Sequence, residues 1–175
     1  MVLNLFVLIV LAGALLKAPT VDFANFTYPA VEPCFPDGIV TGPTVLRHGE
    51  FRVTNPKTLL ETETHLHSVV YGHLRSDGLQ AAVILSCDAY GLPGMYNRGF
   101  LFDVAGRHAK LITTIEGGDE ETGIEDIRIA HGMLYVNRCD PADCSNSLSN
   151  AYRLNGRHLQ FVRQSRHKTE SYPSY

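Results

Sequence analysis

Two histidines, His65 and His67, alternate in a segment with β-strand character, and this spacing is the first hint of chemistry in the sequence. Successive side chains of a strand point to opposite faces, so residues two apart share one face. A His-x-His pair can bind zinc, but a zinc site needs a third ligand, and the neighbouring sequence places none. The pattern favours an exposed polar strand face, with a metal site as the alternative.

A second candidate is the acidic segment EGGDEETGIED, which runs from Glu116 to Asp126. Such a segment can bind calcium weakly or attract a basic partner, and Glu116 and Asp119 are the carboxylates considered alongside the two histidines. A solvated hairpin loop is the favoured interpretation. The chain contains no G-x-G-x-x-G, P-loop, HExxH or G-x-S-x-G motif, so no cofactor is predicted and no catalytic residue is assigned.

Four cysteines, Cys34, Cys87, Cys139 and Cys144, predict two disulfides if the chain is exported. Cys139 and Cys144 share the turn-rich stretch CDPADCSNS, which favours a local bridge between them. Elimination then pairs Cys34 with Cys87. The alternative is that Cys139 and Cys144 bind zinc, but such a site would need a second closely spaced cysteine pair, which the chain lacks.

The amino terminus predicts export. An apolar run from Leu5 to Leu16 is too short to span a bilayer comfortably, and Ala12-Gly13-Ala14 has the small-x-small pattern of a signal-peptidase site. Residues 1–14 are therefore expected to be a signal peptide, which leaves a secreted or periplasmic chain without a stable membrane span. Because Met1–Asn4 carries no Lys or Arg, an uncleaved membrane anchor is the alternative.

The composition is that of one globular domain, with 45% hydrophobic and 19% charged residues and a formal net charge of −3. Lysine and arginine are scattered apart from a small group near the end, which argues against nucleic-acid binding. We expect a monomer whose partner is a protein or a glycan of unknown identity.

The elements that must position these residues are predicted to be β-strands. Prolines in residues 15–49 exclude a central strand or long helix, yet large aromatic residues recur there, so this segment is expected to be an extended strap with its aromatics docked in the core. The prolines are Pro19, Pro29, Pro33, Pro36 and Pro43, and the aromatics are Phe23, Phe26, Tyr28 and Phe35.

Residues 50–165 consist of short β-like runs joined by turn residues, and residues 166–175 are expected to be a polar tail. Ala105-Gly106-Arg107, His131-Gly132 and Asn155-Gly156 predict tight hairpins, and Asp77-Gly78 predicts another in which Gly78 has a positive φ. Turns this short join antiparallel strands. The predicted fold is mostly β: an antiparallel meander forming a sandwich, an open barrel or a single curved sheet, with a proline-rich N-terminal strap.

The stretch YGHLRSDGLQAAVIL resembles a degenerate copy of the Asp-Leu-x-Gly-Asp-Gly-x-x-Glu-Ala segment of FG-GAP and VCBS-type repeats. The chain is also similar to uncharacterised secreted bacterial proteins that share an FTYP entry, a GF-x-Y/F strand and a closing YR-x-N/D-G hairpin. The resemblance implies an exported β domain. His73, Arg75 and Ala81 stand where the repeats carry acids, so the metal binding of those repeats is not carried over, and Arg75 would repel calcium.

Two classes of function remain open. Since catalytic motifs are missing, an exported binding or interaction module is favoured. The alternative is a secreted hydrolase or metal-dependent enzyme with scattered ligands among His65, His67, Glu116 and Asp119.

Export predicts that the mature protein begins at Leu15, after cleavage behind Ala14. Intact-mass spectrometry of the protein recovered from the export compartment measures this directly. A chain that still begins at Met1 would contradict the prediction.

Overall fold

The computed structural model describes residues 21–29, 43–57, 59, 61–89, 95–119 and 122–168. Three predictions concern residues outside these ranges: the signal peptide, the docking of Phe35, and the bridge from Cys34 to Cys87, of which Cys34 lies outside. Cys139 and Cys144 form the predicted local disulfide, with their Cα atoms 5.0 Å apart.

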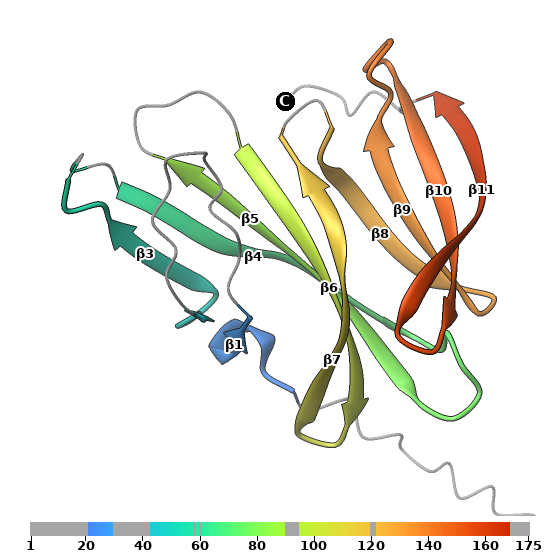
Figure 1. The fold of residues 1–175 in the computed structure, drawn as a ribbon, viewed down its shortest axis with the longest axis horizontal. Coiled ribbons are helices and arrows are strands. Elements are labelled where there is room, and N and C mark those ends of the chain that lie inside the picture. Colours follow the sequence, from blue (N-terminus) through green and yellow to red (C-terminus); the bar gives the residue numbers. More distant parts are fainter. Residues whose placement is uncertain are drawn as a thin grey trace, which may run out of the picture.

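The chain folds into antiparallel sheets, as predicted (Figure 1). The five-stranded sheet has the sequential order β3-β4-β5-β6-β7, and the four-stranded sheet has the order β11-β10-β9-β8. The strands of the first are β3 (Glu50–Thr54), β4 (Glu61–Gly72), β5 (Leu79–Ala89), β6 (Met95–Ala105) and β7 (His108–Gly118). Those of the second are β8 (Ile124–Ala130), β9 (Met133–Cys139), β10 (Asn146–Asn155) and β11 (His158–Lys168). The two meanders pack face to face and form a sandwich. The last strand, β11, continues three residues past the predicted boundary at 165.

The tight hairpins form where the sequence predicts them. His131 and Gly132 both have positive φ, 52° and 71°, which is the signature of a type I′ turn. Gly106 has a φ of 60° at the first central position of the β6–β7 turn. In the last hairpin Asn155 pairs with His158, so the central residues are Gly156 and Arg157, one position later than the Asn-Gly pair suggests.

The connection between β4 and β5 differs from the prediction. It spans residues 73–78, and Gly78 does not have a positive φ. A loop of this length can reverse the chain without a left-handed residue at Gly78. Side-chain contacts hold it instead: Gln80 accepts a hydrogen bond from the Leu74 N–H at 2.8 Å, and Arg75 pairs with Asp77 and Asp103.

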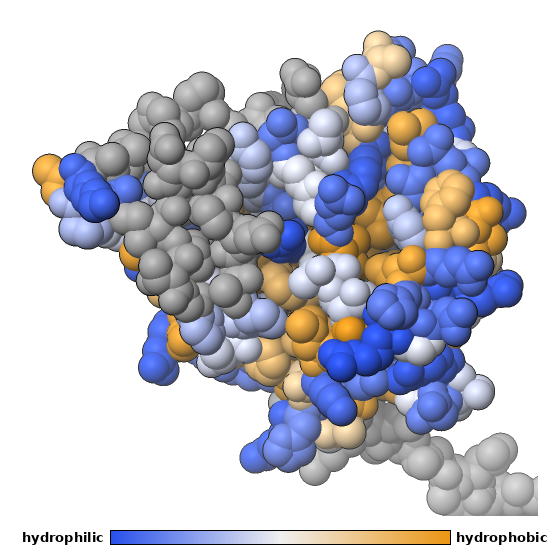
Figure 2. All heavy atoms as spheres, viewed as in Figure 1, coloured by the Kyte–Doolittle hydropathy of each residue, from blue (hydrophilic) through white to orange (hydrophobic). Residues whose placement is uncertain are grey.

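One apolar core lies between the two sheets. Its residues come from the β4–β5 loop and from β5 to β10: Leu74, Ala82, Ile84, Leu101, Ile112, Ile115, Ile124, Ile127, Leu134, Val136 and Leu154. The sheets approach most closely at β8, which contacts β4, β5 and β6. In Figure 2 apolar residues are visible in the middle of this view, and hydrophilic residues cover much of the four-stranded sheet.

A second core covers the opposite face of the five-stranded sheet. Here the described parts of the strap pack on β5 and β6, and they contain η1 (Phe23–Asn25), β1 (Thr27–Tyr28) and β2 (Thr44–Val45). Phe23 and Tyr28 are buried, and the Tyr28 hydroxyl donates to the Phe23 carbonyl at 2.8 Å. The centroid of the Phe102 ring lies 5.4 Å from the ring centroids of both Phe23 and Phe26. The predicted docking of strap aromatics is confirmed for Phe23, Phe26 and Tyr28.

The glycines that bracket the β4–β5 loop are expected to differ in their tolerance of substitution. A Cβ at Gly72 would lie 2.7 Å from Cβ of Ile129 on the opposing sheet, so Gly72→Ala should lower the free energy of unfolding by about 1–3 kcal/mol. A Cβ at Gly78 would meet only Gln80 Nε2, at 3.5 Å, and Gly78→Ala should stay within about 0.5 kcal/mol of the wild type. Urea denaturation measures both, and equal losses would contradict this packing.

Candidate functional site

A continuous row of polar residues runs across four strands of the five-stranded sheet, from β3 to β6. Cross-strand pairing places Glu50 opposite His65, His65 opposite Ser86, and Ser86 opposite Asn97. On β5, Ser86 lies two residues after Ile84 and four after Ala82, both of which belong to the core between the sheets. Because strand side chains alternate, the row lies on the same face as that core.

The row begins where the five-stranded sheet extends beyond its partner (Figure 1), and it ends at Asn97, which bonds to Ile124 of that partner. In Figure 1, β3, the start of β4 and the end of β5 reach away from the four-stranded sheet. A second row runs beside the first, with Arg52 opposite Glu63 and Glu63 opposite Asp88. The inner face of the sheet therefore changes from apolar under the four-stranded sheet to polar at this end.

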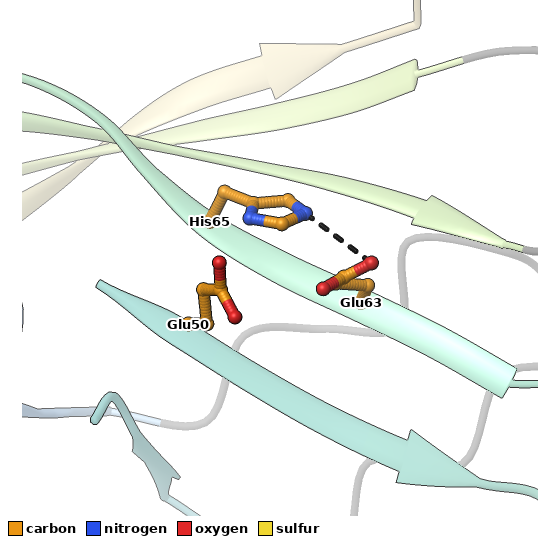
Figure 3. Close-up of side chains that lie close together, drawn as sticks. All are labelled: Glu50, Glu63 and His65. Carbon is orange, nitrogen blue, oxygen red and sulfur yellow. Dashed lines mark ion pairs between the residues drawn. The ribbon is translucent and has the colours of Figure 1, made fainter. Parts of the chain in front are cut away.

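At the β3–β4 end of these rows, Glu50, Glu63 and His65 converge (Figure 3). Their candidate ligand atoms all lie within 4.8 Å of one another, and His65 Nε2 is 3.6 Å from Glu63 Oε2. The Glu63 side chain is only 11% exposed, against 52% for Glu50 and 34% for His65. Arg52 forms an ion pair with Glu63 and lies 3.7 Å from Glu50. A nearly buried carboxylate requires such a cation to offset its lost hydration.

Further along the row is a pocket of about 340 Å³, which we call the acidic cleft. It is lined by His67, Ser86, Asn97, Asp119, Gly123, Ile124 and Glu125. None of these described lining residues is a lysine or an arginine. Asp119 and Glu125 are the two acidic residues of the described lining, so the cleft is suited to a cationic or hydrogen-bonding group.

Asn97 fixes the wall of the cleft by bridging the two sheets. Its Nδ2 donates to the Ile124 carbonyl at 2.8 Å, and its Oδ1 accepts from the Ile124 N–H at 2.7 Å. The backbone of β7 passes so close to Asn97 that a Cβ on Gly117 would overlap its carbonyl group. The first residue of β8 is thereby fastened to the five-stranded sheet through one amide side chain.

Hydrogen bonds hold the described residues of the acidic loop, from which residues 120 and 121 are excluded. Asp119 Oδ1 accepts from the Thr122 N–H at 2.9 Å and from its hydroxyl at 2.8 Å. The Arg138 guanidinium donates to the carbonyls of Thr122, Gly117 and Glu116. Burial lowers the pKa of Arg138 below its ordinary value. The Arg138 side chain therefore stabilises the loop through hydrogen bonds to its carbonyl groups.

The four residues singled out from the sequence occupy three separate places. His65 joins Glu50 and Glu63, whereas His67 and Asp119 line the acidic cleft. Glu116 lines another pocket, of about 420 Å³, with Arg138 and Tyr152. His67 falls at a β-bulge, since the register of β4 against β5 shifts between Leu66 and Ser68. Among the described residues, the four do not form one site.

Sequence reasoning missed Glu50, Arg52, Glu63, Asn97 and Arg138. Glu63 lies two residues before His65, so the period-two pattern already placed it on the histidine face. No local pattern marks the others. Asn97 bonds to a residue 27 positions away in the sequence, and Arg138 bonds to residues 16 and 22 positions away. Only strand pairing brings Glu50 and Arg52 beside Glu63 and His65.

Comparison with known proteins gives no match to a protein family, a curated protein or a solved structure. In the part of the chain that the structure describes, no helix is long and apolar enough to cross a membrane.

The bridge between the sheets predicts a large effect at Asn97. Asn97→Ala removes both partners of the Ile124 backbone groups and should lower the free energy of unfolding by about 1–3 kcal/mol. The matched control is Asn150→Ala, whose side chain bonds an exposed Gln164 at 2.8 Å and should change stability by less than about 0.5 kcal/mol. Urea denaturation distinguishes them, and an Asn97 loss no larger than that of Asn150 would contradict the bridging role.

Proposed function

We propose that this protein is an exported binding module whose acidic cleft receives a cationic side chain, lysine or arginine, of a protein partner. The observation that carries the proposal is the lining of the cleft. Asp119 and Glu125 both line one cavity, and its described lining residues include no lysine or arginine. A recess lined by one sign of charge concentrates ligands of the opposite sign.

The internal contacts of the two carboxylates are compatible with this role. Asp119 accepts hydrogen bonds from Thr122, and Glu125 accepts one from the Ser147 hydroxyl at 2.7 Å. These donors, from Thr122 and Ser147, are neutral groups that orient the carboxylates. A guanidinium or ammonium group can bind to carboxylates held in this way through charge-assisted hydrogen bonds.

Export is part of the proposal and is supported by the apolar leader and by the Cys139–Cys144 bridge, because disulfides persist in oxidising compartments. The resemblance to secreted bacterial β proteins points the same way. The alternative of a hydrolase or metal-dependent enzyme built from His65, His67, Glu116 and Asp119 gains less support, since these side chains are divided among three places.

The test is a titration of the ¹⁵N-labelled protein with Nα-acetyl-arginine amide, with Nα-acetyl-glutamine amide as the neutral probe. We expect arginine-specific shifts at residues 67, 86, 97, 119 and 123–125, which weaken as salt is raised. Glu125→Gln should reduce the affinity about threefold to tenfold. Glu116→Gln removes the same charge outside the cleft and should leave the affinity unchanged.

Two results would overturn the proposal. One is equal binding of the charged and neutral probes. The other is a neutral oligosaccharide that shifts the cleft residues when the arginine probe does not, because this would make the ligand a glycan.

A further inference from the structure

We propose that Glu50, Glu63 and His65 bind a divalent transition-metal ion of the zinc type. This site is distinct from the acidic cleft and does not depend on the proposed function. Imidazole nitrogen and carboxylate oxygen are both ordinary zinc ligands, whereas calcium selects oxygen alone. Three protein ligands would leave one position of a tetrahedral ion for water.

The separation of the ligand atoms fits such an ion. Two ligands about 2.1 Å from a tetrahedral centre lie about 3.4 Å apart. His65 Nε2 and Glu63 Oε2 are already 3.6 Å apart. A carboxylate oxygen of Glu50 lies within 4.8 Å of one ligand atom of each of the other two residues, and the Glu50 side chain is 52% exposed. Glu50 is therefore free to close the remaining distance by a change of rotamer.

Strand pairing places the three residues side by side. Glu63 and His65 lie two residues apart on β4, and Glu50 is the cross-strand partner of His65 on β3. Figure 3 shows the three side chains turned toward one another over the same face. Sites built on paired strands are held more precisely than sites on loops.

Arg52 provides the second, independent indication that this place is suited to a cation. Its guanidinium pairs with the nearly buried Glu63 carboxylate and lies beside Glu50. The Arg52 side chain is 55% exposed, so it can swing into water when an ion arrives. Arg52 thus neutralises the Glu63 carboxylate when no metal ion is bound, and it competes with the ion for this carboxylate.

The experiment is a calorimetric titration of the tag-free, chelator-treated protein with Zn²⁺. We expect one ion per chain, together with a rise in melting temperature. His65→Ala and Glu63→Gln should each weaken binding about tenfold or more. Arg52→Gln should strengthen it by up to about fivefold, because the competing pair is removed. A shift of the His65 imidazole ¹⁵N resonances on adding Zn²⁺ reports coordination directly.

His108→Ala is the control, since His108 is an exposed histidine at the start of β7 and should bind no ion in this site. Circular dichroism of each variant without zinc establishes that it is folded. Unchanged Zn²⁺ affinity in folded His65→Ala, or weaker binding in Arg52→Gln than in the wild type, would overturn the proposal.

Discussion

The structure depends on burying both faces of β5. Ala81, Val83 and Leu85 pack under the strap aromatics, and Ala82 and Ile84 pack between the sheets. All five are at most 1% exposed. A strand buried on both faces must be covered twice, so the proline-rich strap is as necessary to the fold as the four-stranded sheet. The strap meets this need with aromatic rings, which bury a large area with few residues.

The same strand determines where polar chemistry can occur. Beyond Leu85 the inner face of β5 continues with Ser86 and Asp88, and the neighbouring strands align His65, Glu63 and Asn97 with them. Polar groups are tolerated there because the five-stranded sheet extends past the four-stranded one (Figure 1). The proposed metal site and the acidic cleft both belong to this end of the sheet.

Two polar side chains, Asn97 and Arg138, determine how the sheets are joined above the cleft. Asn97 pairs with both backbone groups of Ile124, and Arg138 donates to carbonyls at the end of β7 and at Thr122. Hydrogen bonds have directional requirements that apolar contacts lack. These hydrogen bonds therefore restrict the positions of Thr122 and Ile124 more than apolar packing alone would.

The sequence by itself determined the strands, their antiparallel pairing, the local disulfide and the tight hairpin at His131-Gly132. Each of these follows from alternation, from short connections or from residues a few positions apart. Local reasoning was wrong at Gly78, because a six-residue loop held by Gln80, Arg75 and Asp103 needs no left-handed glycine there. Only the tertiary structure decided which polar residues meet. Strand register brings Glu50 to His65, and a bulge at His67 moves this histidine toward the cleft. Register is set by the packing of whole sheet faces, because a slip of one residue would turn every side chain of a strand to the opposite face.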